Sequence, residues 1–373
     1  MENVSSLHDK SAMSRQLLGI VAICWIGLLL LAGCGEQGDH RVVAQTVEVE
    51  KPRLVLYNWE EYMGEETLWK FEQATGIEVE ERTYEDEEEV LGALQSGSLN
   101  ADLIILSSST AREMAGARLL SPLDMDLLPN LRHLDPQALV QDKPMNQRYH
   151  VPYLMGYTGV AVDTRHYHEP PDSWRVLWDS RLKGKMAMLN NPFEVIGAAS
   201  MMLGYPLNPE MEHMEAIREA LLEQKPLLVD YLHDTAIMHQ LGSGDLWAAQ
   251  SYSSDALRAM EENPYLQFGF PEEGCTAWVD VFVLPLMSRN PEAAHAFIDF
   301  VHTPEIMAEI ASELWSATPN LAAREFMDPE VLNSPVVHPP ANIMDKCYYF
   351  GNLGDPETVG LRMKLWAELL AGM

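Results

Sequence analysis

Residues 57–62 read YNWEEY, three aromatic rings and two adjacent carboxylates that follow the apolar residues 54–56. The apolar residues predict a short strand that ends here, and a turn after a strand does not need three rings to stay soluble. Carboxylates attract the charged ends of an organic cation, and ring faces attract both its charge and its methylene groups. The segment therefore points to a site for an elongated organic cation at a strand end.

The chain that follows this segment alternates between strand and helix. The spacing of its apolar residues predicts strands at 54–57, 77–83 and 102–106 and helices at 65–75 and 86–95. This order is typical of an α/β domain with a parallel sheet, and ligands of such sheets bind outside the carboxyl ends of the strands. Because YNWEEY and the later SSST segment both follow predicted strands, we expect them at the rim of the domain rather than in its core.

A second block of elements begins near residue 151. Its predicted strands cover residues 159–162, 185–189, 245–250 and 278–284, and its predicted helices cover residues 195–203, 291–301 and 357–370. A chain of 373 residues is long enough for two domains with cores of their own. Its content of 47% hydrophobic and 22% charged residues is that of a globular protein.

The formal net charge is −31, from 56 acidic and 25 basic residues. A surface of this sign repels nucleic acid and anionic lipid and favours cationic partners. A need for solubility also explains such a charge, and charge alone does not separate the two explanations.

The N-terminus has the pattern of an export signal. An apolar run at residues 17–31, too short to span a membrane comfortably, ends in the motif LAGC at Cys34. This pattern predicts a lipoprotein signal peptide at residues 1–33, followed by a lipidated Cys34 and a flexible leash over residues 34–50. The alternative is a short anchor helix, and in both cases the folded part is exported and tethered to a membrane, in the periplasm or at the cell surface.

The four cysteines divide into two groups. Cys24 lies in the predicted signal peptide and Cys34 is the predicted lipid carrier, which leaves Cys275 and Cys347 in the folded part. In an exported protein such a pair forms either a disulfide or two buried free thiols, and the sequence leaves both possibilities open.

Motifs of enzyme chemistry are missing from the sequence. It contains no glycine-rich phosphate loop, nucleophile elbow, HExxH or CxxC motif, so we expect a binding protein without cofactor or metal. An exported hydrolase with paired carboxylates is the alternative, and the many acidic residues could supply such a pair by chance.

Several segments together resemble the polyamine-binding proteins of bacteria, the substrate-binding components of spermidine/putrescine ABC transporters. These segments are LYNWEEY, FEQATGIEVEERTYE, DLIILSSS, VPYLMGYTGVAV, WVDVFVLP and ATPNLAAREF, which span nearly all of the chain after the leash. The resemblance implies a two-lobed periplasmic-binding-protein fold of type II, each lobe a mostly parallel sheet flanked by helices and joined by a hinge. We expect lobe 1 at residues 51–155 plus 281–324 and lobe 2 at residues 156–280 plus 325–373.

The resemblance also implies a ligand site. Its candidate residues in this sequence are Trp59, Glu60, Glu61, Tyr62, Ser107, Glu194, Tyr252, Asp255, Trp278, Asp280 and Ser316. Three positions depart from the family pattern: Glu60 replaces a small polar residue, Asn191 an aspartate of spermidine-type members, and Ser316 a tyrosine. These departures leave the preferred chain length of the polyamine open. Because the candidate acids outnumber the charges of a diamine, we expect at least one to be protonated or turned outward in the empty site.

The predicted function follows from the resemblance. We expect a monomeric, lipid-anchored receptor that captures a polyamine between two closing lobes and delivers it to the membrane permease of an ABC transporter. The alternative is a polyamine sensor of the same fold, which signals to a membrane receptor instead of transporting. The binding residues would be the same in both cases.

Overall fold

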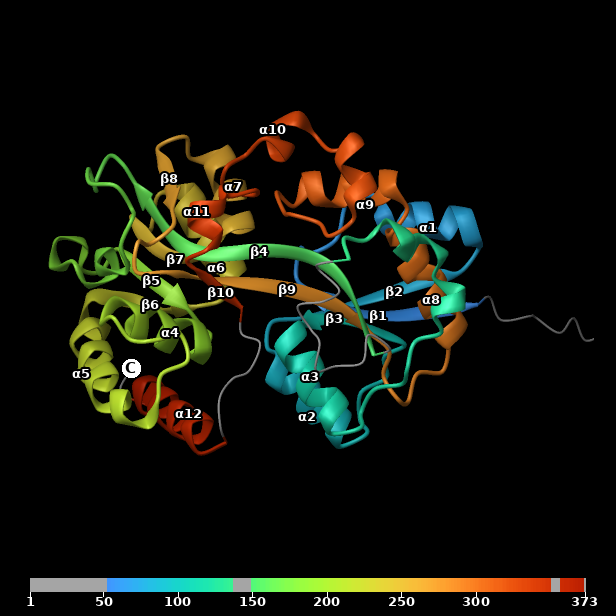
Figure 1. Cartoon of the computed structure of the whole chain (residues 1–373), viewed down its shortest axis with the longest axis horizontal. Coiled ribbons are helices and arrows are strands. Elements are labelled where there is room, and N and C mark those ends of the chain that lie inside the picture. The colour runs from blue at the N-terminus through green and yellow to red at the C-terminus, as the bar shows by residue number, and fades with distance from the viewer. Residues whose placement is uncertain (1–51, 137–148, 350–355, 372–373) are drawn as a thin grey trace, which may run out of the picture. The chain divides into compact units, whose positions relative to one another are not determined.

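The computed structural model describes residues 52–136, 149–349 and 356–371 (Figure 1). The described residues form one compact unit. The predicted signal peptide, the lipidated Cys34 and the leash lie outside the described residues.

The first part of the unit has the predicted βαβαβ order. Its strands are β1 (Arg53–Trp59), β2 (Glu78–Tyr84) and β3 (Leu103–Ser107), and its helices are α1 (Thr67–Thr75), α2 (Glu87–Gln95) and α3 (Ser108–Gly116). Strand β1 pairs in parallel with both β2 and β3. Helix α1 stops at Gly76, whose positive φ of 74° suits a residue without a Cβ. The α/β prediction for this part is confirmed.

A second group of parallel strands follows later in the chain. It consists of β5 (Met186–Leu189), β6 (Leu228–Leu232) and β7 (Ala248–Tyr252), with helices α4 (Pro192–Met202), α5 (Met214–Gln224), α6 (Asp234–Ser243) and α7 (Ser253–Glu262). Strand β5 pairs in parallel with both β6 and β7. Of these elements the sequence predicted β5, β7 and α4, within a few residues of their observed bounds.

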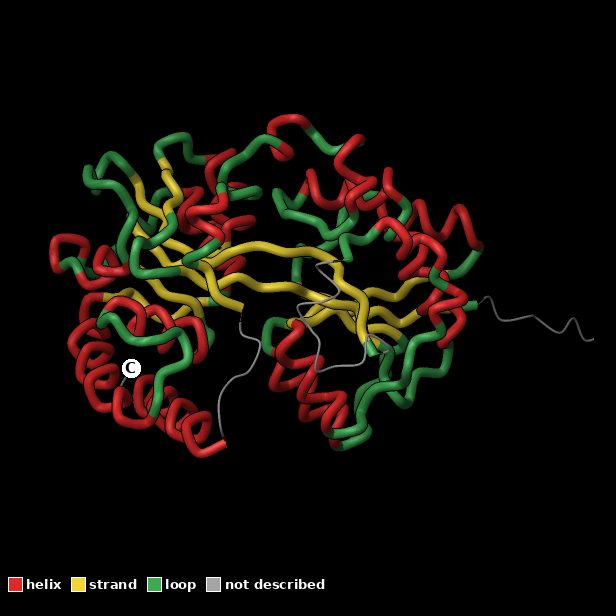
Figure 2. Tube along the Cα trace, in the orientation of Figure 1, coloured by secondary structure: helices red, strands yellow, loops and turns green. Residues whose placement is uncertain are grey.

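Two long antiparallel strands join the two groups. Strands β4 (His150–Asp163) and β9 (Cys275–Val283) pair with each other, and the path across the sheet runs β2-β1-β3-β9-β4-β7-β5-β6. The continuous yellow band in Figure 2 follows this path. Short strands β8 (Leu266–Gly269) and β10 (Cys347–Tyr349) add to β4 and β9 respectively. The sequence predicted only residues 159–162 of β4, because Pro152 and Gly156 interrupt the strand pattern in its first half.

The remaining helices follow β9 in the sequence. They are α8 (Pro291–Val301), α9 (Pro304–Glu313), α10 (Pro329–Leu332), α11 (Ala341–Met344) and α12 (Pro356–Ala371). Short 3₁₀ helices lie at Met125–Leu127, Pro129–His133, Trp174–Trp178, Ser180–Leu182, Met211–His213, Lys225–Leu227 and Leu321–Glu325. Helix α8 has the predicted bounds, and α12 extends one residue beyond its prediction at each end.

The buried side chains form separate hydrophobic cores. The largest contains Leu54, Phe71 and Phe297 and lies among β1, α1 and α8, whereas another contains Trp174 and Ile196 and lies around α4 and α12. The predicted division into two lobes stays a prediction. The described residues contain neither a helix long and apolar enough to cross a bilayer nor a cluster of side chains suited to hold a metal ion.

Candidate functional site

The ends of the strands surround a cavity of about 760 Å³. Its lining comes from both parallel strand groups and from β9 between them. The predicted ligand residues that line it are Trp59, Glu60, Glu61, Tyr62, Ser107, Glu194, Tyr252, Asp255, Trp278 and Asp280. Segments far apart in the sequence are thus brought together as the strand-end rule predicts.

Ser316 is the predicted residue that the structure does not bring to the cavity. It is only 2% exposed, and its hydroxyl donates a hydrogen bond to the carbonyl of Leu314 at 3.1 Å. Its backbone N–H donates to Ala311 at 2.9 Å, so the residue belongs to the end of α9. The resemblance placed a family tyrosine at this position, and the serine is too short to replace its ring.

Trp278 and Asp280 lie on β9, at the centre of the sheet. Residue Gly156 of β4 is opposite Trp278 in the strand register, and a Cβ at Gly156 would lie 2.2 Å from the indole ring. The glycine therefore makes room for the indole. The ring of Tyr252, at the end of β7, meets Trp278 edge to face with centroids 5.8 Å apart and an interplanar angle of 76°. Two ring systems from different strands thus form one wall of the cavity.

Asp280 is held by a side chain of the opening motif. The hydroxyl of Tyr62 donates a hydrogen bond to Asp280 Oδ2 at 2.8 Å. Burial, and to a smaller extent the charges of Glu87 and Asp234, raise the pKa of Asp280 to about 7, while the bond from Tyr62 acts in the opposite direction. A cation beside this carboxylate would favour its ionised form.

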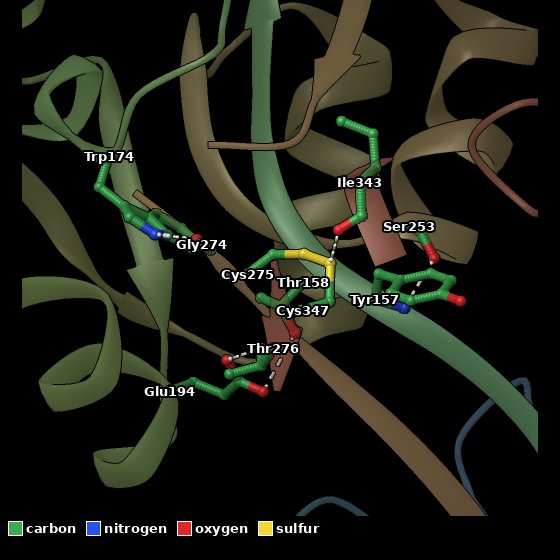
Figure 3. Close-up of a disulfide and its surroundings, with 10 residues drawn as sticks. All are labelled: Tyr157, Thr158, Trp174, Glu194, Ser253, Gly274, Cys275, Thr276, Ile343 and Cys347. Carbon is green, nitrogen blue, oxygen red and sulfur yellow. Dashed lines mark hydrogen bonds between the residues drawn. A yellow bond between two sulfur atoms is a disulfide. The ribbon is translucent and has the colours of Figure 1, made fainter. Parts of the chain in front are cut away.

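Glu194 is the most deeply buried acid among the predicted residues, at 4% exposure. It stands in the first turn of α4, which Asn191 caps by accepting from the N–H groups of Phe193 and Glu194. Thr158 of β4 and Thr276 of β9 donate hydrogen bonds to its two oxygens at 3.0 and 2.7 Å (Figure 3). Burial still outweighs these bonds and raises the pKa of Glu194 to about 7.

A second aspartate accompanies Asp255 in the cavity. Asp234 begins α6 and lines the same space, and sequence reasoning missed it because β6, the strand before it, was not predicted. Burial raises the pKa of Asp255 well above its usual value, and the neighbouring charge of Asp234 acts in the same direction. The positive charge of Arg258 lowers the pKa of Asp255 but does not offset these two effects.

Glu87 is a further residue that sequence reasoning missed. It accepts hydrogen bonds from the backbone N–H and the hydroxyl of Ser107, the latter at 2.8 Å, and from the hydroxyl of Thr110. Burial raises the pKa of its carboxyl group. The acidic run at residues 85–89 follows the predicted strand at 77–83, so the rule that placed YNWEEY at the rim could have placed this run there too.

Acidic residues that follow β1 and β2 contact basic side chains of the α6 and α7 region. Glu61, which has a positive φ of 53° in the turn after β1, pairs with Arg258 of α7 at 2.8 Å and with His239 of α6 at 3.6 Å. Glu85, after β2, lies 3.2 Å from His233. The Glu61–Arg258 pair is partly exposed and contributes little energy, and each histidine contact is an ion pair only when the histidine is protonated.

The cavity has the chemistry of a site for an organic cation. Its lining holds many more carboxylates than the two guanidinium groups of Arg112 and Arg258 can neutralise. The raised pKa values of Asp280 and Glu194 agree with the expectation that some acids hold protons when the site is empty. Rings and carboxylates both line the space, as an elongated ligand with charged ends and methylene groups would need.

Comparisons with known proteins agree with this chemistry. The putrescine-binding periplasmic protein PotF of Escherichia coli is 26% identical over 348 residues, which cover 88% of this chain and 94% of PotF. The putrescine/cadaverine-binding protein of Pseudomonas aeruginosa is 29% identical over 342 residues, which cover 87% of this chain and 95% of that protein. The crystal structure of the spermidine/putrescine ABC transporter substrate-binding protein PotD of Streptococcus pneumoniae has a TM-score of 0.73 and 26% identity, with 86% of this chain and 99% of that chain covered.

A family model covers most of the folded part. The model of the bacterial extracellular solute-binding proteins matches residues 67–335, which include every predicted ligand residue except those of the opening motif. The fold described above resembles that of the solved PotD structure over 86% of this chain. The chain therefore belongs to the family of bacterial extracellular solute-binding proteins.

Proposed function

We propose that this protein captures a polyamine of the putrescine/spermidine class in the cavity and delivers it to the permease of an ABC transporter. The observation that carries the proposal is the combination of the Tyr252–Trp278 ring wall with the buried carboxylate of Asp280 in one space. The relatives that bind putrescine, cadaverine or spermidine support the choice of ligand class.

The energetics of the site suit a flexible cation. One ammonium–carboxylate contact at about 4 Å contributes about 4 kcal/mol before desolvation is subtracted, at an effective dielectric constant of about 20. A ring face contributes roughly 0.5–2 kcal/mol more. Several contacts of both kinds are needed to offset the desolvation of the ammonium groups and the ordering of the ligand. The cavity offers them at Asp280, Glu194 and Asp255 and on the rings of Tyr252 and Trp278.

The anchor and the membrane partner complete the proposal. The LAGC motif at the end of the apolar N-terminal run supports export and lipid attachment at Cys34. A lipid-anchored monomer with a flexible leash would hold its ligand close to the permease. The substrate-binding role of the PotD relative in an ABC transporter supports delivery to such a permease.

Calorimetric titration of the chain from residue 36 onward tests the ligand class. The protein is first unfolded and refolded to remove carried-over ligand, and the panel contains putrescine, cadaverine, spermidine, norspermidine and spermine, with lysine and maltose as controls. Saturable one-to-one binding of at least one polyamine, without binding of the controls, is the expected result. A folded protein that binds none of the polyamines would refute the proposed function.

A further inference from the structure

The C-terminal part of the chain contributes a wall of the cavity. Tyr349 of β10 lines it, together with Val359, Met363 and Trp366 of α12. These side chains are aromatic or apolar and differ in this from the acidic lining at the strand ends. The wall therefore offers contacts to the uncharged part of a ligand.

Strands β10 and β3 pair with different parts of the same edge of β9 and leave two residues of that edge without a strand partner among the described residues. Strand β3 pairs with residues 280–283 of β9, and β10 pairs with residues 275–277 along the same edge. Trp278 and Val279 lie between these two partners, where β9 faces the cavity. In the strand register Tyr349 is opposite Ala277, the residue next to Trp278.

A disulfide links the two strands at the start of this pairing. Cys275 and Cys347 are register partners and form a disulfide between residues 72 positions apart in the sequence (Figure 3). Strand β10 has only three residues, so backbone pairing gives it little support of its own. The disulfide closes a long loop and restricts the positions that this short strand can adopt.

The disulfide and Tyr349 belong to one small cluster. Cys275 is 1% exposed and packs with Tyr157 and Ala277, and Cys347 and Tyr349 pack against this group. One residue after Cys275, Thr276 donates to Glu194. The link therefore fixes β10 against the part of β9 that carries ligand-site residues.

Side chains alternate along β10, which provides an internal control. Tyr348 is 51% exposed and does not line the cavity, whereas Tyr349 is partly buried and does. Neighbouring residues of a strand point to opposite faces. Two tyrosines one position apart therefore differ in access to the ligand and share the same strand.

We propose that Tyr349 contacts the ligand and that the Cys275–Cys347 disulfide is the clasp that holds it in position. The part of the proposal that names a ligand rests on the proposed polyamine-binding function. The Tyr349 ring supplies an aromatic face beside Trp278 for the methylene groups or the charge of the cation. Loss of the disulfide frees the short strand and removes this face from the site.

Paired substitutions test the contact. Titration calorimetry with spermidine and putrescine compares Tyr349→Ala with Tyr348→Ala in the chain from residue 36 onward. We expect Tyr349→Ala to weaken binding about tenfold and Tyr348→Ala to change it by less than about twofold, with equal melting temperatures. Tyr349→Phe should keep most of the affinity, because the ring is retained. Unchanged affinity in Tyr349→Ala, while the wild type binds, would overturn the assignment of Tyr349.

A double-mutant cycle tests the clasp. The variant Cys275→Ala/Cys347→Ala should bind about tenfold more weakly than the wild type. Adding Tyr349→Ala to this variant should lower its affinity by less than a further factor of about three, because the ring is already displaced. Additive losses would show that the disulfide and Tyr349 act separately and would overturn the clasp. Wild-type affinity without the disulfide would do the same.

Hydrogen exchange without ligand separates this inference from the proposed function. Peptides that cover residues 277–280 and 347–349 should exchange faster in the variant without the disulfide, or in the wild type reduced by a phosphine, than in the oxidised wild type. If no polyamine binds the wild type but this difference appears, the proposed ligand class is wrong and the clasp stands. If exchange at both peptides is unchanged, the clasp is wrong whatever the ligand.

Discussion

Asp280→Asn is the substitution that probes the proposed cation site most sharply. Asparagine keeps the size of the side chain and can still accept the hydrogen bond that Tyr62 donates to Asp280 at 2.8 Å. It removes only the negative charge. The fold is therefore expected to persist while the attraction to an ammonium group is lost.

The size of the effect follows from the position of the carboxylate. A charge pair at about 4 Å contributes about 4 kcal/mol gross, and removal of one partner of a buried, hydrogen-bonded pair costs about 2–5 kcal/mol. Because the pKa of Asp280 is raised to about 7, part of the binding energy in the wild type is used to ionise it at neutral pH. We therefore expect the lower end of this range, about 2 kcal/mol or about 30-fold in Kd.

The same substitution should stabilise the ligand-free protein. The pKa of Asp280 rises from an ordinary value of 3.8 to about 7 in the folded state. As the pH rises between these values the unfolded chain loses this proton first, so the wild type loses stability from about pH 4 to pH 7. Asp280→Asn removes this penalty, and its melting temperature at pH 7 should exceed that of the wild type.

Calorimetry and thermal unfolding of the same preparations distinguish the outcomes. Asp126→Asn, at an exposed residue outside the cavity lining, is the matched control and should leave both affinity and melting temperature unchanged. Weaker binding together with a higher melting temperature is the expected signature of Asp280→Asn. Wild-type affinity in this variant would remove Asp280 from the ligand site and refute the charge argument.

Three further predictions concern other parts of the site. Because the pKa values of Glu194 and Asp280 are both raised to about 7, wild-type binding should strengthen from pH 6 to pH 8. Glu194→Gln should reduce this rise and leave the part that comes from Asp280; a rise as steep as that of the wild type in calorimetry would contradict the prediction. Trp278→Ala should weaken binding about tenfold in fluorescence titration. Trp69→Ala, at a ring on α1 that is 58% exposed and outside the cavity lining, should leave binding unchanged. Equal losses of affinity in the two variants would exclude a specific contact between the ligand and the Trp278 ring. Removal of the Cys275–Cys347 disulfide should lower the unfolding free energy by about 2–5 kcal/mol in urea titration, and no change would show that the link does not constrain the unfolded chain.

Local patterns predicted the elements whose apolar residues are regularly spaced. Helix α8 was predicted to the residue, and β1, β2 and β3 within two residues at each end. Helix α8, β1 and β3 have an uninterrupted apolar face or run, and β2 was predicted from an alternating pattern. Strand β6 was missed because its burial shows no strict alternation and only Tyr231 is fully buried. Strand β10 was missed because three residues carry too little pattern.

The site was predictable where a motif or a strand end marked it. The residue types of the opening motif suggested its role, the family resemblance supplied Trp278 and Asp280 of β9, and the structure brings them to one cavity. Asp234 depends on the long-range pairing of β6 with β5, which no local pattern reveals, and Tyr349 reaches the cavity through the pairing of β10 with β9. The sequence also left the state of Cys275 and Cys347 open, and their register across two strands shows why they pair.

A crystal structure of the protein with the polyamine that binds it most tightly would test the central claim most directly. We predict one ligand in the cavity, with an ammonium nitrogen within hydrogen-bond distance of Asp280 and methylene groups against the ring of Trp278. A ligand bound elsewhere, or a cavity without the polyamine at saturating concentration, would contradict the account.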